Sequence, residues 1–201
     1  MAAYKRIILK LSGETLAPVN KSGSFDAERV DRAAEAIIRL HDMGVQVGVV
    51  LGGGNIWRGR FSDEMNPVNA DQMGMLATII NALAVQDAIV RLGRRASVLT
   101  AQEMTRFARL YTRDTAIGLM EAGEIVLLSG GSGNPFFTTD TAAALRAAEL
   151  NADAVFKGTT VEGVFDSDPR KNPNAKLLSE LTYQEALDKD LKVMDATAFS
   201  L

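Results

Sequence analysis

Short runs rich in Ile, Val and Leu recur along the chain, and each is closed by a glycine or another turn residue. The runs occupy residues 6–11, 46–51, 96–100, 125–129 and 154–157. Each is a nearly continuous apolar run, which is typical of strands buried on both faces. Longer stretches with apolar positions at helical spacing lie at 27–43, 73–92, 112–121 and 141–150. The alternation of strand and helix predicts an α/β fold with a parallel sheet.

Composition narrows the function classes. The chain has 201 residues, 47% of them hydrophobic and 23% charged, which suits one domain with a sizeable core. A net charge of -3 lacks the basic surplus that nucleic-acid binding needs, so we expect no nucleic-acid partner. The absence of cysteine excludes disulfides and thiolate metal sites, and it favours a cytoplasmic protein.

Two apolar segments can be examined as membrane segments, and neither has the pattern of one. The N-terminal apolar run covers only residues 7–9, which is too short for a signal peptide. The stretch at 73–92 is interrupted by Asn81, Asp87 and Arg91, which are costly in a bilayer. We therefore expect a buried or subunit-facing helix there and no membrane partner.

The stretch SGGSGNPFFTTD, residues 129–140, joins a buried strand to an alanine-rich helix. Its glycines allow positive φ, so successive N–H groups could converge on an anion at the positive end of the helix. A flexible turn followed by a helix cap would have the same composition. Ligands of open α/β sheets bind beyond the carboxyl ends of the strands. The segments that follow the other strands therefore help to decide between an anion-binding loop and a plain turn.

Two more strand ends carry similar chemistry. The first strand runs into Lys10, Ser12 and Gly13, where an ammonium could neutralise a transferring phosphoryl group. The second runs into three glycines, 52–54, followed by Arg58, whose guanidinium suits phosphate oxygens. The alternatives are a solvated strand end for the lysine and a mobile tight turn for the glycines.

The segment after the last predicted strand contains Lys157, Phe165 and Asp168. The aromatic ring and the carboxylate could hold an adenine and a ribose, but without the other loops core packing for Phe165 and a turn at Asp168 are the favoured explanations. The chain contains no Walker P-loop and no G-x-G-x-x-G. With His41 as the single histidine, no Ser/His/Asp set can be assembled, and no His/Asp/Glu cluster at metal-ligand spacing is visible in the sequence.

Five segments carry a family resemblance. They are KLSGE at 10–14, LGGGNIWRG at 51–59, DQMGMLATIINALA at 71–84, GSGNPFFTTDTAAALRAAE at 131–149 and KGTTVEGVFDSDP at 157–169. Together they resemble the bacterial uridylate kinases of the amino-acid kinase family, over residues 4–201. The resemblance implies a three-layer αβα sandwich, divided here into a UMP-side lobe at 1–155 and an ATP-side lobe at 156–201. It also implies transfer of the γ-phosphoryl group of MgATP to UMP in pyrimidine nucleotide synthesis.

The resemblance also implies roles for individual residues. Lys10 would stabilise the transferring group, Asp140 would orient Lys10, and Arg58 would assist catalysis. The ATP contacts would be Lys10, Leu11, Ser12, Gly13, Gly54, Arg58, Thr159, Phe165 and Asp168. The UMP contacts would be Gly53, Asp71, Ser132, Gly133, Asn134, Pro135, Phe136, Phe137, Thr138 and Thr139. Mg²⁺ would be held by the phosphates, and the assembly would be a homo-hexamer with GTP as activator and UTP as inhibitor.

Three departures from the family pattern matter. Thr160 stands where a second lysine is common, which removes one charge near the ATP phosphates. The sequence KSGSFD at 21–26 replaces the turn of the segment linked to GTP, so GTP regulation is an open point. The sequence stops at Leu201, where family members continue into a final strand. We expect from this a truncated ATP-side lobe with an unpaired sheet edge, and weaker catalysis.

Two other functions remain on the same fold. A noncatalytic nucleotide-binding or storage protein would bind ATP and UMP without turnover, although the presence of Lys10, Arg58 and Asp140 argues against it. An amino-acid kinase that forms an acyl phosphate is disfavoured by the GNPFFTTD segment.

Overall fold

The computed structural model describes residues 3–19, 22–58, 65–159, 162–169, 171–191 and 193–201. Six strands form one sheet in the order β4-β3-β5-β2-β1-β6, and every pairing in it is parallel. The strands are β1 (Arg6–Leu11), β2 (Gln46–Leu51), β3 (Ala96–Thr100), β4 (Arg109–Leu110), β5 (Ile125–Ser129) and β6 (Ala154–Lys157). The five strands predicted from apolar runs are confirmed, and the two-residue β4 is an addition.

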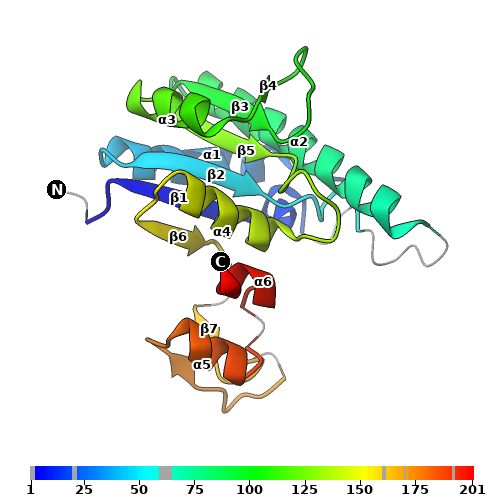
Figure 1. Cartoon of the computed structure of the whole chain (residues 1–201), viewed down its shortest axis with the longest axis vertical. Coiled ribbons are helices and arrows are strands. Elements are labelled where there is room, and N and C mark those ends of the chain that lie inside the picture. The colour runs from blue at the N-terminus through cyan, green and yellow to red at the C-terminus, as the bar shows by residue number, and fades with distance from the viewer. Residues whose placement is uncertain (1–2, 20–21, 59–64, 160–161, 170, 192) are drawn as a thin grey trace.

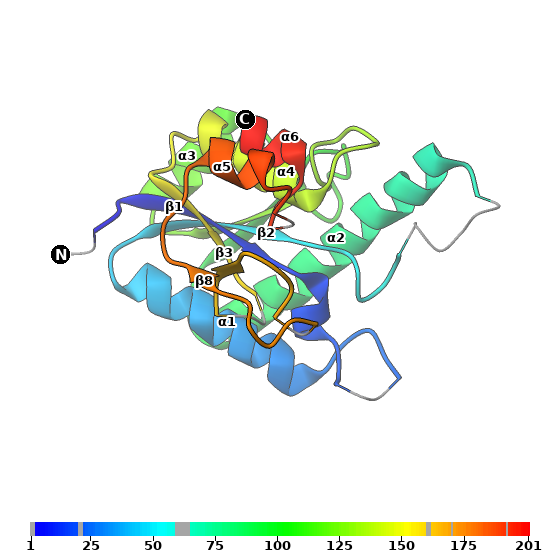
Figure 2. The same cartoon turned by 90° about the horizontal axis from the view of Figure 1, so that it is seen from below.

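Helices cover both faces of the sheet (Figure 2). One pair is α1 (Ala27–Asp42) and α2 (Pro67–Arg91), and the other is α3 (Arg113–Glu121) and α4 (Thr139–Glu149). Alternation along each strand divides the core: Ile7 and Leu9 pack with α1 and α2, whereas Ile8 packs with α3 and α4. The predicted three-layer αβα sandwich is therefore confirmed.

Helix boundaries show where the sequence pattern was misleading. The pattern predicted a helix from residue 73, but α2 begins at Pro67, with the side chain of Asn66 accepting a hydrogen bond from the Val68 N–H. The prediction was wrong because the first turn is polar, while Asn followed by Pro is a helix start. By contrast, Gly44, Gly93 and Gly123 follow helices with φ between 77° and 83°, as C′ glycines do.

Helix α2 is long and apolar enough to cross a membrane, judged by length and composition alone. Half of its most apolar 18-residue window is buried inside the protein. Its residues Ala82, Val85 and Ile89 belong to the core beneath the sheet. The expectation of a buried helix therefore holds for one face of α2.

A small lobe follows the main sheet and comprises the described residues 162–169 and 171–191. It contains an antiparallel pair, β7 (Val164–Phe165) and β8 (Leu177–Leu178), and the helix α5 (Tyr183–Asp188). Figure 1 shows β7 and α5 apart from the six-stranded sheet, with α6 (Ala196–Ser200) between them and the sheet. Strand β6 crosses the lobe boundary that we expected between residues 155 and 156, and that boundary stays a prediction.

Strand β6 forms one edge of the sheet. Among the described residues it pairs with β1 alone, and Phe156 on it is 42% exposed. The Phe156 ring meets Tyr4 edge-on with centroids 5.7 Å apart. This edge therefore carries an apolar surface that the sheet itself does not cover.

Gly118 is a glycine inside α3 where a larger side chain has room. A Cβ built on it would meet nothing within 4 Å. We expect Gly118→Ala to raise the free energy of unfolding by about 0.5–1 kcal/mol, because alanine loses less backbone entropy on folding. Urea unfolding measures this change. Gly93→Ala is the control and should destabilise the protein, because Gly93 has φ +82°; equal effects of the two changes would contradict the assignment.

Candidate active site

The carboxyl ends of β1, β2, β5 and β6 meet at one edge of the sheet. Because neighbouring strands are parallel and in register, Lys10 on β1 lies beside Val50 on β2 and Lys157 on β6. Strand β5 pairs with β2 on its other side. The glycine-rich loops that follow these strands therefore converge, as the sequence predicted.

Asp140, in the first turn of α4, holds two lysines. Its Oδ1 lies 2.7 Å from the Lys10 Nζ, and its Oδ2 accepts a hydrogen bond of 2.7 Å from the Lys157 Nζ. The side chains of Lys10, Asp140 and Lys157 are only 11%, 14% and 25% exposed. The cluster thus holds one net positive charge where water is largely excluded, which suits an anionic ligand.

The glycines after β1 and β2 let the two loops touch. A Cβ on Gly13 would lie 2.3 Å from Asn55 Oδ1 and 2.5 Å from the Gly52 carbonyl oxygen. Asn81 of α2 is fully buried there and donates to Gly52 O at 2.6 Å and to Asn55 Oδ1 at 2.7 Å. Sequence reasoning gave Asn81 no role, although a polar residue inside an apolar helix was the available signal.

The loop after β5 is fixed by buried side chains. Gly130, Gly131 and Gly133 have φ of 77°, 63° and 87°. Thr78 of α2 accepts a hydrogen bond from the Gly130 N–H at 2.9 Å. The guanidinium of Arg146 is buried 3.9 Å from the centre of the Tyr111 ring and reaches the Gly131 carbonyl at 3.5 Å. The loop is therefore held in shape by contacts from α2 and α4.

A cavity of about 380 Å³ lies between these loops and the start of α2. Its lining consists of Glu14, Gly53, Gly54, Trp57, Arg58, Ala70, Asp71, Gly74, Met75, Thr78, Gly131, Ser132, Phe137, Thr138 and Thr139. The volume falls in the usual range of small-molecule sites, and the wall combines glycine backbone with convergent polar groups. The cavity is thus a candidate ligand site.

Comparisons with known proteins agree with this geometry. The family model described as "Amino acid kinase family" matches residues 5–201. The chain belongs to the amino acid kinase family. Two similar proteins are both called "Uridylate kinase". The one from Bacteroides thetaiotaomicron is 50% identical over 98% of this chain and 84% of its own length. The one from Colwellia psychrerythraea is 51% identical over 99% and 81%.

A solved structure is similar to this chain along nearly all of its length. It is the UMP kinase from Bacillus anthracis, with a TM-score of 0.94 and 37% sequence identity. The match covers 98% of this chain and 82% of that one. The mainly parallel sheet with helices on both faces is therefore an amino acid kinase fold.

The amino acid kinase cavity brings together part of the predicted nucleotide contacts. The predicted residues in its lining are Gly53, Gly54, Arg58, Asp71, Ser132, Phe137, Thr138 and Thr139. Lys10 to Gly13, and the loop residues 133–136, lie outside that lining. Phe165 lies on β7 of the small lobe, paired with Leu177. Thr159 and Asp168 are not in the lining either, so the adenosine contacts stay predictions.

Asp71 and Arg58 already have partners in this structure. Asp71 Oδ2 accepts a hydrogen bond of 2.7 Å from the Phe136 N–H, which ties the β5 loop to α2. Arg58 donates from Nε to the Gly54 carbonyl at 3.0 Å and forms an ion pair through Nη2 with Glu14. The sequence analysis gave Glu14 no role. Its carboxylate neutralises the cation that we expected to face phosphates.

Asp195 is a further residue that sequence reasoning missed. It begins α6, yet its carboxylate accepts hydrogen bonds from the hydroxyls of Thr138 and Thr141 at the start of α4. Burial raises the pKa of Asp195, but the hydrogen bonds from Thr138, from the Ala198 N–H and from Thr141 lower it more, so the net shift is downward. The carboxylate therefore stays ionised at neutral pH and fastens α6 to the site.

Of the departures noted in the sequence, two residues lie outside the described part of the chain, whereas residues 22–26 of the KSGSFD segment are described and Asp26 caps α1. The two are Thr160 and Lys21, the first residue of the KSGSFD segment.

Proposed function

We propose that this chain transfers the γ-phosphoryl group of MgATP to UMP, giving UDP and ADP in pyrimidine nucleotide synthesis. Relatives half identical to it carry the name uridylate kinase. The observation that carries the proposal is the Lys10–Asp140 ion pair at the point where the glycine loops converge. An oriented ammonium where glycine-rich loops converge is what phosphoryl transfer requires.

The reaction needs alignment more than proton transfer. A phosphate oxygen of UMP attacks the γ-phosphorus of ATP, and the bond from that phosphorus to the β,γ-bridging oxygen breaks as ADP leaves. The nucleophile is already ionised because the second pKa of a phosphate monoester is about 6. No general base is then needed, so Asp140 can act by holding the Lys10 ammonium against the transferring group.

The cavity supports the acceptor half of this proposal. Ser132, Phe137, Thr138 and Thr139 line the cavity from the segment after β5, and Asp71 lines it from α2. A carboxylate can accept hydrogen bonds from both ribose hydroxyls. Asp71 would then exchange its Phe136 partner for the sugar, and the loop residues 132–139 would enclose UMP.

The donor half would be built from the β1 and β2 loops. Lys10 to Gly13, with Gly54 and Arg58, would contact the ATP phosphates, while Thr159, Phe165 and Asp168 would contact adenosine. Mg²⁺ would be carried by the phosphates. Among the described residues, no group of three or more His, Asp or Glu side chains gathers to hold a metal. The donors present are ammonium and backbone groups, which suit phosphates rather than a bare cation.

An acceptor panel tests the proposed reaction. ADP release from ATP is measured with UMP, CMP, AMP, aspartate, glutamate and carbamate, each at several concentrations. We expect turnover with UMP to exceed that with the other acceptors. Turnover only with an amino acid or carbamate would instead indicate an acyl-phosphate-forming kinase. Binding of ATP and UMP without ADP release would indicate a storage protein.

The proposal also covers location, assembly and regulation. The protein would be a cytoplasmic homo-hexamer that GTP activates and UTP inhibits. The outer face of α2 supports the assembly, because Met73, Leu76, Ile80 and Val90 are exposed there at helical spacing. The regulators can be tested by adding GTP or UTP to the UMP assay.

The assembly gives a separate prediction. We expect Leu76→Glu combined with Ile80→Glu to shift the protein to smaller species, because two charges would have to be buried in the subunit contact. Light scattering after size exclusion measures the mass. The control is Tyr183→Glu. Tyr183 lies on the small lobe, and its aromatic side chain is also exposed. If both proteins keep the wild-type mass, α2 does not form the contact.

A further inference from the structure

Lys157 is the member of the partly buried Lys10–Asp140–Lys157 cluster that has no role in the proposed reaction. It lies directly beside Lys10 in the β1–β6 register. Two ammonium groups at neighbouring positions repel each other. The Asp140 carboxylate lies between them and offsets that repulsion, because Oδ1 pairs with Lys10 and Oδ2 pairs with Lys157. The position of each lysine therefore depends on the other through Asp140.

The ammonium groups of Lys10 and Lys157 differ in how many of their hydrogen-bond donors are directed to protein acceptors. The Lys157 Nζ donates to Asp140 Oδ2 and also to the Val193 carbonyl oxygen. In the described part of the chain, the Lys10 Nζ has Asp140 as its ion-pair partner, at 2.7 Å. An ammonium has three donors. Lys10 thus keeps donors for a ligand, while Lys157 is turned toward the protein.

The Val193 carbonyl belongs to the segment that leads into α6. Two residues later, Asp195 accepts hydrogen bonds from Thr138 and Thr141 at the start of α4. Residues 193–195 are therefore tied to the base of the site at two points, by Lys157 and by Asp195. Figure 1 shows α6 between α4 and the small lobe, where such a tie would link the two parts.

We propose that Lys157 is a positioning residue for the transfer step. It fixes the Asp140 carboxylate through its second oxygen, so that Asp140 holds Lys10 in one orientation, and it couples this arrangement to residues 193–195. With Lys157 absent, the carboxylate can rotate, and Lys10 with it. A displacement of about 1 Å at a reacting group can cost about 100-fold in rate. This inference rests on the proposed kinase activity.

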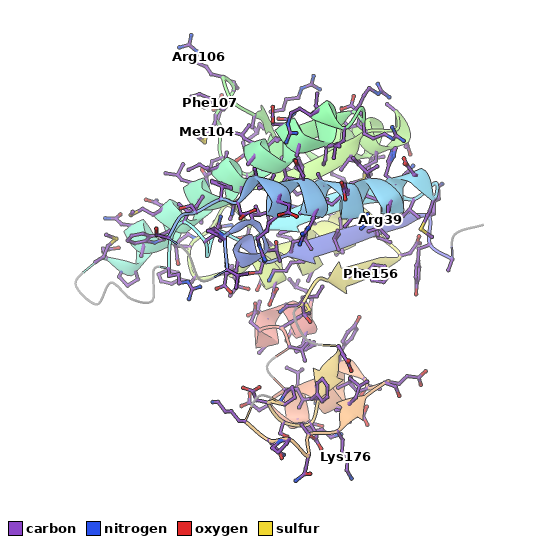
Figure 3. The ribbon with its side chains drawn as sticks, turned by 180° about the vertical axis from the view of Figure 1, so that it is seen from behind. Arg39, Met104, Arg106, Phe107, Phe156 and Lys176 are labelled. Carbon is purple, nitrogen blue, oxygen red and sulfur yellow. The ribbon has the colours of Figure 1, made fainter. Side chains whose placement is uncertain are left out.

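The test compares Lys157→Met with Lys157→Arg. We expect K157M to lower kcat with UMP and ATP by about 10-fold or more, with KM for UMP changed less than about 3-fold, because positioning acts on the transition state. K157R should recover part of kcat, since it keeps the charge. The control is K176M, an exposed lysine at the far end of the small lobe in Figure 3, which should leave kcat unchanged.

A double-mutant cycle separates positioning from a general loss of structure. If Lys157 acts through Asp140, K157M should change kcat by less than about 3-fold in an Asp140→Asn background, so the two effects are not additive. Full additivity, or a K157M enzyme with wild-type kcat, would overturn the proposal. If K157M does not fold, the same cycle with Lys157→Gln decides the question.

Hydrogen exchange gives a readout that does not need activity. We expect the amides of Val193 and Ala198, which donate to Leu191 O and to the Asp195 carboxylate, to exchange faster in K157M than in the wild type. A wild-type protein without UMP-dependent ADP release would defeat the proposed function. Unchanged exchange in K157M would defeat the coupling of Lys157 to residues 193–195, whether or not the enzyme is active.

Discussion

Asp140→Asn is expected to lower kcat for UMP phosphorylation by about 10²- to 10³-fold, which is the cost of removing one preorganised electrostatic group from an active site. Asparagine has one acceptor oxygen, so it can serve only one of the two ammonium groups that Asp140 now holds. Its NH₂ group would face the other ammonium. Lys10 and Lys157, adjacent in register, would then repel each other without a counter-charge.

Steady-state kinetics with UMP and ATP measure this effect, and thermal melting checks that the variant is folded. The matched control is Asp153→Asn, which makes the same chemical change at the opposite end of β6. Asp153 is exposed and accepts hydrogen bonds from the Lys5 and Arg6 N–H groups, which lower its pKa. We expect D153N to leave kcat unchanged. An Asp140→Asn enzyme with more than about half of the wild-type kcat would contradict the assigned role.

The sheet could be predicted because the signal is local. Continuous apolar runs such as residues 46–51 are required wherever a strand is covered on both faces, and the glycine at position 44 marks the end of the preceding helix. The first turns of α2 were missed because Asn66 and Pro67 start the helix through capping and not through apolar periodicity. Local chemistry, when read for caps as well as for period, would have found that start.

The residue types of the site could be predicted from the sequence, but the contacts between them could not. Those contacts depend on strand register and on pairs of residues far apart in the chain. The pairing of Lys10 with Lys157 follows from strand alignment, which no local pattern fixes. Asp195 reaches Thr138 across 57 residues of sequence. The role expected of Arg58 is modified by Glu14, 44 residues away in the chain. Residue type therefore indicated phosphate chemistry, whereas the partners that orient the groups came only with the fold.

The second large effect is a loss of stability expected on substituting Gly13. Its cause is a steric clash and not a change in charge. Gly13→Ala should lower the free energy of unfolding by about 3–5 kcal/mol, the sum of an overpacked site and a broken buried hydrogen bond. The added Cβ would lie 2.3 Å from Asn55 Oδ1, 2.5 Å from Gly52 O and 2.9 Å from Asn81 Nδ2. Gly52 O is backbone, and the two asparagines are hydrogen-bonded to each other, so none can withdraw cheaply.

Urea unfolding measures this loss, and Gly54→Ala is the matched control within the same pair of loops. A Cβ on Gly54 would meet only Glu14 Oε1 at 3.9 Å, which is ordinary contact. We expect that control to change stability by less than about 1 kcal/mol. Adding Asn55→Ala to Gly13→Ala should recover only part of the loss, because Gly52 O stays in place. Full recovery would place the clash at the asparagine alone, and wild-type stability of Gly13→Ala would show that the β1 and β2 loops do not touch as described.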